Sequence, residues 1–198
     1  MRAVSKHGLA ILLVVAGLAA FSAEPGVQEA IRTEIEQLRE TGRLSADGIE
    51  VASGELLARI YENRNFEPAW TDVEKMDELI RLVESTAEDG LDPADYHLEA
   101  LNRVHKRLAA DQHFDATQRA DIDIGMTDSL IRIVYHRRFG KVNPNDLDPD
   151  WNFQRELRRR DPAIVFQEAM DADSLAGYLE STFPRDELYR RMQAYLAQ

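Results

Sequence analysis

The chain contains no cysteine among its 198 residues. A protein without cysteine forms no disulfide bond, so its stability must come from packing. The same absence excludes a thiol nucleophile in this chain, and with it every acyl transfer that needs a thiolate from these residues.

Basic residues are few relative to acidic ones. There are 24 Lys and Arg against 36 Asp and Glu, which gives a formal net charge of −12. Phosphate backbones and anionic lipid headgroups would repel such a molecule, so we expect no nucleic-acid partner. The basic run at residues 155–160 is the clearest local exception, and a run of this kind is most often a solvated helix face.

Catalytic and cofactor motifs are also missing. The sequence holds no G-x-S-x-G motif, no phosphate-binding loop, no dinucleotide fingerprint and no metalloprotease pair of histidines. We therefore predict no catalytic, cofactor-binding or metal-binding residue. A metal-dependent or carboxylate hydrolase stays open as an alternative, because scattered carboxylates can pair in space without a sequence signal. Trp70 and Trp151 each follow a turn sequence and are interpreted as plugs over the core rather than as sugar-stacking residues.

The N-terminus has the pattern of a secretory signal peptide. Arg2 and Lys6 precede an apolar run, and Ala20 and Ser22 are the small residues of a cleavage site after Ser22. The run is shorter than the roughly 20 residues that cross a bilayer, which disfavours an uncleaved anchor. We predict that residues 1–22 are removed, that the mature protein is periplasmic in a Gram-negative bacterium, and that membrane contact ends with cleavage.

The remaining sequence predicts an all-α fold. No segment alternates with a period of two over a useful length, whereas apolar residues recur at helical spacing. Residues 23–52 are expected to form a partly helical N-terminal arm, with a helix from about Val27 to Arg39. Residues 53–198 are expected to form an irregular helical domain of about six to seven helices. Its central helix is predicted from Ala116 to Phe139, because two apolar stripes indicate burial on more than one side. Other helix starts are predicted at Ser53, at Thr71 with Glu74 as a capping box, at Asp92 and Pro93 for a helix that runs to about Ala110, at Asp161 and Pro162, at Asp173, and after Pro184.

The stretch from Gly90 to His97 places two carboxylates and an imidazole close together. It could be a metal site or an acid/base centre. Helix chemistry explains it equally: Asp92 before Pro93 is a routine helix start, and Gly90 suits the end of the preceding helix. Asp95 and His97 stand two residues apart, a spacing that points side chains to different faces. We interpret the stretch as architecture.

The C-terminal helix carries Leu188, Met192 and Tyr195 on one face, with no glycine, asparagine or proline stop behind it. This pattern predicts a helix that leads into a further domain. The chain is then either a truncated gene product or a stand-alone relic.

Three segments together resemble the N-terminal scaffold domain of the large YcbB-type murein L,D-transpeptidases. They are residues 60–72, residues 87–101, and residues 130–144 followed by Trp151. The resemblance covers roughly Ser53 to the end. The residues that fit the family pattern are Tyr61, Arg64, Pro68 and Trp70 in the first segment, and Gly90, Leu91, Asp92, Pro93, Tyr96 and His97 in the second.

The resemblance implies a helical, non-catalytic domain of an enzyme that makes 3→3 cross-links in peptidoglycan. In that family a separate catalytic domain supplies the cysteine nucleophile, and this chain has none. The resemblance therefore implies a transpeptidase catalytic domain or peptidoglycan as partner, and no activity of the chain by itself. An independent periplasmic helical interaction module is the alternative.

Overall fold

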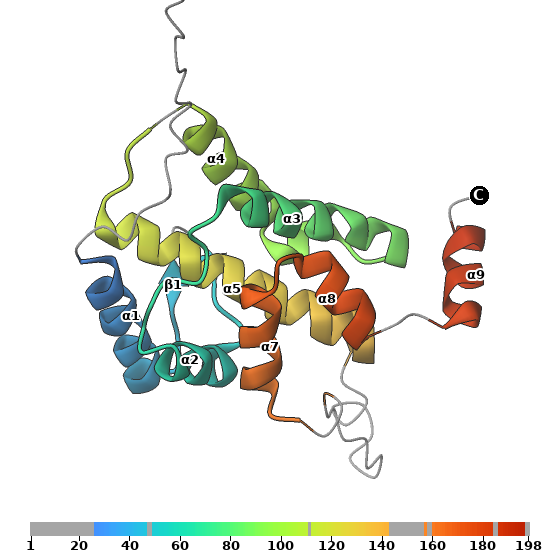
Figure 1. Cartoon of the computed structure of the whole chain (residues 1–198), viewed down its shortest axis with the longest axis horizontal. Helices are drawn as coiled ribbons and strands as arrows, with labels where there is room; N and C mark the ends of the chain where they lie inside the picture. Colours follow the sequence, from blue (N-terminus) through green and yellow to red (C-terminus); the bar gives the residue numbers. More distant parts are fainter. Residues whose placement is uncertain are drawn as a thin grey trace, which may run out of the picture.

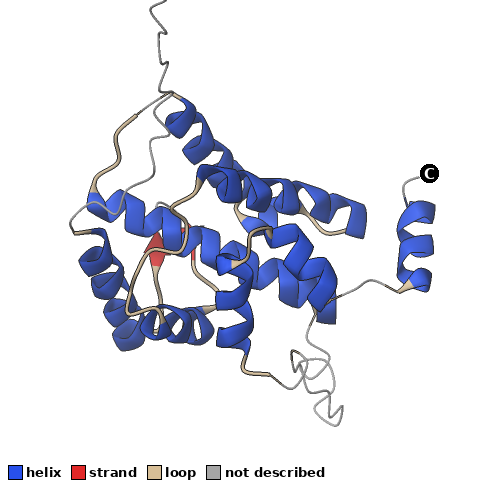
Figure 2. Ribbon diagram, in the orientation of Figure 1, coloured by secondary structure: helices blue, strands red, loops and turns tan. Residues whose placement is uncertain are grey.

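The computed structural model describes residues 26–46, 49–110, 112–142, 157, 160–183 and 186–196. The described part is all-α, as predicted, and seven of its α-helices lie within residues 53–198 (Figures 1 and 2). None of the described helices is long and apolar enough to cross a membrane. The predicted signal peptide, Trp151 and most of the basic run lie outside the described residues. The helices are α1 (Val27–Thr41), α2 (Gly54–Asn63), α3 (Val73–Glu84), α4 (Leu98–Ala109), α5 (Ala116–Phe139), α7 (Pro162–Asp171), α8 (Leu175–Thr182) and α9 (Glu187–Leu196), with 3₁₀ turns η1 (Ser85–Asp89) and η2 (Pro93–Tyr96).

Helix α5 is the centre of the fold and has the predicted bounds. It begins with a capping box, in which the Asp115 carboxylate accepts from the Gln118 amide at 2.9 Å and the Gln118 side chain accepts from the Asp115 amide at 3.2 Å. It ends at Gly140, whose amide donates to the carbonyl of His136 at 2.9 Å. Buried residues occur all around its middle turns, which confirms burial on more than one side.

The other helices surround α5. Figure 1 shows α3 and α4 on one side of it and α1 and α2 on the other, with α7 packed against α2 and α8 against α3. The buried apolar residues of these helices form one hydrophobic cluster. Trp70, in the α2–α3 loop, belongs to that cluster and is 1% exposed, which confirms that it fills the core.

Helix α1 extends this core toward the N-terminus. Val27, Ile31, Ile35 and Leu38 lie on one face at helical spacing, and all four are buried against the rest of the chain. The sequence suggested an arm that precedes the helical unit at Ser53. The packing instead includes residues 27–41 in the same hydrophobic core, because a stripe of four apolar side chains is stable only when it is covered.

Three helix boundaries differ from the sequence-based predictions. The cap of α3 is Asp72 rather than Thr71, since the Asp72 carboxylate accepts from the Glu74 amide at 2.9 Å. Helix α3 ends at Glu84 rather than at Gly90, because residues 85–89 tighten into the 3₁₀ turn η1. Helix α8 is capped by Ser174 rather than Asp173. At the two helix starts, two neighbouring residues suit the cap position, and tertiary packing selects one of them.

One short hairpin was not predicted. Strands β1 (Ser45–Ala46) and β2 (Ile49–Glu50) pair antiparallel. The Asp-Gly sequence between them is a common hairpin signal that could have indicated it. The hairpin lies close to α5 at Gly125, where an added Cβ would come within 2.8 Å of the Ile49 side chain. Glycine at this helical position therefore permits the approach of the hairpin.

Candidate functional site

The central helix buries polar side chains as well as apolar ones. Asp123 is 3% exposed, and Thr127, Asp128 and Ser129 are completely buried. A buried polar group costs free energy unless it is hydrogen-bonded, and a buried carboxylate costs the most. The partners of these four residues therefore show what the helix is built to hold.

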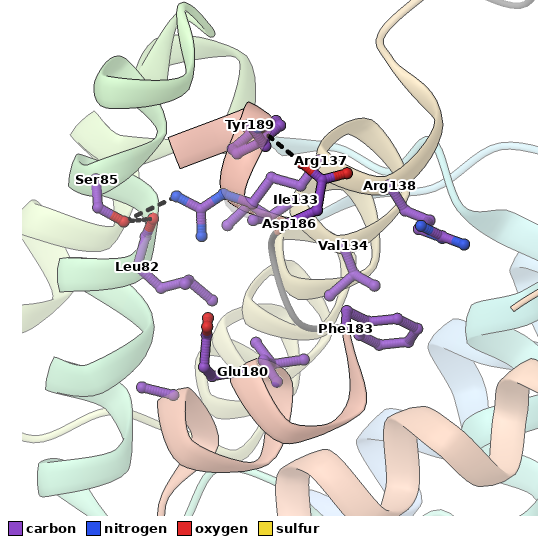
Figure 3. Close-up of a pocket in the computed structure, with 12 residues that line it drawn as sticks. Leu82, Ser85, Ile133, Val134, Arg137, Arg138, Glu180, Phe183, Asp186 and Tyr189 are labelled. Atoms are coloured by element: carbon purple, nitrogen blue, oxygen red, sulfur yellow. Dashed lines mark hydrogen bonds between the residues drawn. The ribbon is translucent and has the colours of Figure 1, made fainter. Parts of the chain in front are cut away.

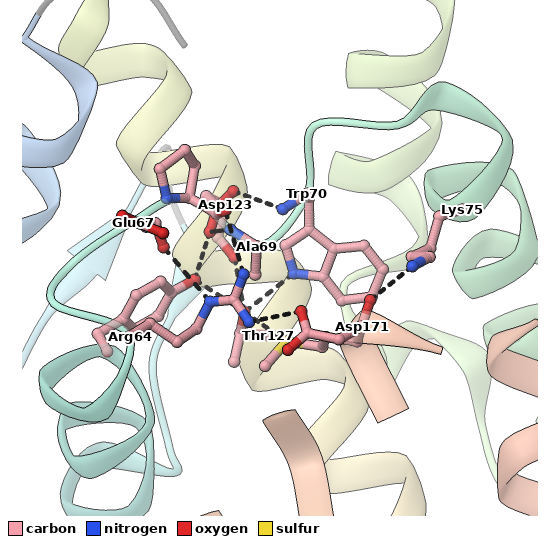
Figure 4. Close-up of polar contacts among 11 residues, drawn as sticks. Arg64, Glu67, Ala69, Trp70, Lys75, Asp123, Thr127 and Asp171 are labelled. Carbon is pink, nitrogen blue, oxygen red and sulfur yellow. Dashed lines mark hydrogen bonds and ion pairs between the residues drawn. The ribbon is translucent and has the colours of Figure 1, made fainter. Parts of the chain in front are cut away.

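Asp123 and Thr127 hold the loop between α2 and α3 (Figure 4). The Asp123 carboxylate accepts from the Tyr61 hydroxyl at 2.6 Å and from the backbone amides of Ala69 and Trp70, each at 2.9 Å. The Thr127 hydroxyl accepts from the Trp70 indole N–H at 2.9 Å and lies 2.8 Å from the Tyr61 hydroxyl. We call these five residues the first clasp. Its donors and acceptors are matched, so the buried carboxylate is well satisfied.

Arg64 closes the same loop from its outer side. Its guanidinium donates to the carbonyls of Glu67 and Pro68 and forms an ion pair with Asp171 of α7 at 2.7 Å (Figure 4). The guanidinium thereby connects α2, the loop and α7. This loop is therefore fixed by three residues that carry the family resemblance: Tyr61, Arg64 and Trp70.

The burial of the first clasp is visible in its acid–base properties. Burial raises the pKa of Asp123, and the hydrogen bonds from Ala69, Tyr61 and Trp70 oppose that shift. Burial, together with the neighbouring Asp123 charge, raises the pKa of Tyr61 well above its ordinary value. Tyr61 therefore remains a hydrogen-bond donor in the folded protein, which is the state that the clasp requires.

Asp128 holds a second set of partners on another side of α5. Asp123 and Asp128 are five residues apart, which places them about 140° apart around the helix. The Asp128 carboxylate accepts from the amides of Ala52 and Ser53 at 3.1 and 2.8 Å. Its second oxygen lies 3.1 Å from Nε2 of His97 and 3.9 Å from the guanidinium of Arg132. Asp128 thus fixes the start of α2 and the start of α4 on the central helix.

Ser129 and His136 complete the attachment of this region. The Ser129 hydroxyl lies 3.1 Å from the carbonyl oxygen of Tyr96, and the Tyr96 hydroxyl lies 3.0 Å from Nδ1 of His136. The rings of Tyr96 and His136 meet edge to face with centroids 5.6 Å apart. We call the following five residues the second clasp: Asp128, Ser129, His136, Tyr96 and His97.

The stretch from Gly90 to His97 is therefore architecture. Gly90 has the left-handed conformation and ends η1, and the Asp92 carboxylate accepts from the Ala94 amide at 3.0 Å, with Pro93 as the first residue of η2. Asp92 before Pro93 predicts the start of an α-helix, but the cap opens a 3₁₀ turn, because His97 takes a positive φ of 63° before α4 begins. Asp95 pairs with Lys141 and His97 with Asp128, so each side chain has its own partner, although both residues line one pocket beside Arg132.

Asp92 gives a direct test of the capping interpretation. Replacing Asp92 by alanine is expected to lower the free energy of unfolding by about 1 kcal/mol, whereas asparagine should leave it nearly unchanged, because asparagine caps as well as aspartate does. Urea unfolding followed by circular dichroism measures both. Equal losses for the two variants would contradict a capping function and favour a need for the charge.

Tyr96 gives a test of burial at alkaline pH. Burial, with the nearby Asp95 charge, raises the pKa of Tyr96 to about 12 from 10.0. Above pH 10 the unfolded chain loses this proton while the folded chain keeps it, so stability falls as the pH rises toward 12. Tyr96→Phe cannot ionise. It should therefore lose less stability than the parent between pH 9 and pH 11, as measured by urea unfolding at the two values, and equal losses would show that Tyr96 is not the group responsible.

Each polar group of the clasps is committed to another group of the protein. The described residues contain no cluster of three or more His, Asp or Glu placed to hold a metal ion. What the arrangement does is mechanical: side chains from one helix fix the loops and helix starts on two of its sides. The class of protein that this defines is a helical structural module.

The comparisons with known proteins agree with that class. The model of the scaffold-domain family matches residues 55–196, a span that includes both motif segments at 61–70 and 90–97. The chain belongs to this family, the N-terminal scaffold of YcbB-type L,D-transpeptidases, which confirms the resemblance. No curated protein and no solved structure matches the chain.

The loop residues of each clasp could be identified from the sequence, but most of their partners on α5 could not. The sequence identifies the motif residues in the loops, and the i, i+4 spacing of Asp128 and Arg132 predicts a pair whose side chains lie 3.9 Å apart, but it gives no partner for Asp123, Thr127 or Ser129 of α5. One signal was present: these polar residues interrupt a helix whose apolar residues already indicated burial on more than one side. Polar residues in the middle of such a helix must be buried, and therefore need partners.

Proposed function

We propose that the chain serves as a non-catalytic scaffold for a peptidoglycan L,D-transpeptidase, in cell-wall biogenesis in the periplasm. Family membership is the observation that carries the proposal, since the family model covers most of the chain. The signal-peptide pattern at residues 1–22 supports export to the compartment where peptidoglycan is cross-linked. The clasps support a rigid module, because they are buried, hydrogen-bonded networks.

The scaffold acts by presenting a fixed surface rather than by chemistry. A rigid scaffold loses less conformational entropy when a catalytic domain docks on it than a mobile chain would lose. The nucleophile for acyl transfer must come from that catalytic domain, because the chain has no cysteine. Peptidoglycan is the second partner that the proposal includes.

The test is reconstitution with purified parts. The mature chain is first exported by the bacterium, and its mass is measured to verify that residues 1–22 are absent. It is then incubated with tetrapeptide-containing muropeptides. We expect no 3→3 cross-linked dimer from the chain by itself. A catalytic domain from a scaffold-bearing L,D-transpeptidase is then added, and we expect it to bind the chain and to yield more dimer with the chain than without it.

Two controls make the result decisive. A catalytic domain with its cysteine replaced by alanine should bind the chain but form no dimer. Pull-down on purified sacculi measures any peptidoglycan binding separately. A correctly folded chain that neither binds the catalytic domain nor changes the dimer yield contradicts the scaffold proposal and favours an independent interaction module.

A further inference from the structure

Helix α9 turns most of its apolar side chains away from the hydrophobic core, unlike an ordinary amphipathic helix. Leu188, Met192, Tyr195 and Leu196 are 68%, 62%, 80% and 65% exposed, and no residue of α9 is buried. An amphipathic helix normally turns its apolar stripe toward the core. Here Leu188, Met192 and Tyr195 face solvent, whereas Leu196 lies near the body, where a Cβ added at Gly90 would come within 3.4 Å of its side chain. Figure 1 shows α9 at the edge of the molecule.

On the side of α9 that faces the protein, two polar side chains donate to the carboxylate of Asp89. Asp89 accepts on one oxygen from the Tyr189 hydroxyl at 2.8 Å and from the side-chain amide of Gln193. Tyr189 and Gln193 are four residues apart and so lie on the same face of α9. Tyr189 and Gln193 are half-buried, whereas the other residues of α9 are exposed. An exposed ion pair also joins Arg190 of α9 to Glu180 of α8.

The acceptor is held in place by groups outside α9. The other Asp89 oxygen accepts from Nε of Arg137 at 2.6 Å, and the same guanidinium donates to the Ser85 hydroxyl at 2.9 Å. The Asp89 side chain is 1% exposed. Its position is therefore set by η1 and α5, so the docking point persists whether or not α9 occupies it.

The first residues of α9 border a cavity of about 400 Å³ between α3, α5 and α8 (Figure 3). Leu82, Ile133, Val134 and Phe183 form the apolar part of its lining, and Arg137, Arg138 and Glu180 form a charged part. Two residues at the start of α9, Asp186 and Tyr189, form part of its wall. The Tyr189 side chain thus takes part both in the wall of the cavity and in the contact with Asp89.

We propose that α9 is a latch, docked on Asp89 as in this structure and released in a second state that opens the cavity between α3, α5 and α8. Release changes the exposure of Leu188, Met192 and Tyr195 little, because these side chains are already in solvent. The apolar surface that it uncovers is the part of the cavity wall beside Tyr189. The hydrogen bonds to Asp89 exchange for hydrogen bonds to water, and the net gain from such bonds is small. The two states are therefore close in free energy, unlike those of a helix that is held by apolar packing.

The experiment measures the distance from α9 to the body in solution. Spin labels are attached to cysteines introduced at Arg81 of α3 and Met192 of α9, both exposed, and the chain has no native cysteine to remove. Pulsed electron–electron resonance should show two distance populations in the parent. The double variant Tyr189→Phe, Gln193→Ala removes both donors and leaves the pair of Asp89 and Arg137 intact. It should raise the released population about tenfold or more.

A matched control and a second readout test the two parts of the proposal. Tyr195→Phe removes a hydroxyl from the exposed side of α9 and should leave the distances as in the parent. The apolar dye 8-anilinonaphthalene-1-sulfonate should bind more strongly to the double variant than to the parent, because the cavity is open. A single distance that is unchanged in the double variant, or a released population without increased dye binding, overturns the latch.

Discussion

Replacing Asp123 by alanine is expected to lower the free energy of unfolding by about 3–5 kcal/mol. The substitution leaves the buried amides of Ala69 and Trp70 and the Tyr61 hydroxyl without the acceptor that now satisfies them. Each buried donor left unpaired costs about 1–3 kcal/mol. Water cannot easily replace the carboxylate, because the Asp123 position is 3% exposed.

The asparagine variant separates hydrogen bonding from charge. Asp123→Asn keeps one acceptor oxygen but presents an amide group to one of the donors, so an intermediate loss of about 1–3 kcal/mol is expected. Urea unfolding compares the free energies of unfolding of four proteins: the parent, the two Asp123 variants, and Asp92→Ala, which removes an exposed cap. If Asp123→Ala costs no more than Asp92→Ala, the first clasp is not an important source of stability.

The helices could be predicted from the sequence because they depend on local patterns. The bounds of α5 follow from Asp115 and Gln118 at its start, Gly140 at its end, and two apolar stripes between them. These signals lie within a few residues of the feature that they determine. The same holds for α7, where Asp161 and Pro162 mark the start as predicted.

The clasps could not be predicted because their partners are distant in sequence. Asp123 is 62 residues from Tyr61, and Asp128 is 75 residues from Ser53. A carboxylate on a helix has the same sequence signature whether it faces solvent or a buried backbone amide. Only the tertiary arrangement of the α2–α3 loop against α5 distinguishes these two cases.

The start of α4 shows how a distant contact changes local structure. Pro93 and the helical pattern after it predicted one continuous helix, but the chain forms η2 and then turns at His97. A positive φ is unusual for histidine and costs free energy, which the surroundings must offset. The contact of His97 with the buried Asp128 provides that compensation. A local rule therefore fails where the second clasp acts on the backbone.

Asp128 itself gives the second large effect. Asp128→Ala is expected to lower the free energy of unfolding by about 2–4 kcal/mol, because the amides of Ala52 and Ser53 lose their acceptor and His97 loses its contact with the carboxylate, which leaves Nε2 only its contact with Arg132 at 3.3 Å. Asp128→Asn should cost about 1 kcal/mol, since its carbonyl oxygen can still accept from both amides and its NH₂ group can donate to the neutral imidazole.

Amide hydrogen exchange distinguishes this expected result from a general loss of stability. In Asp128→Ala, exchange should accelerate first at residues 52–57 and 97–101, the segments that Asp128 fixes, while the α2–α3 loop held by Asp123 remains protected. In Asp123→Ala the order should reverse, with residues 64–72 exchanging first. Exchange that accelerates equally in both segments in both variants would mean that the two clasps unfold as one unit, and that α5 does not hold its two sides independently.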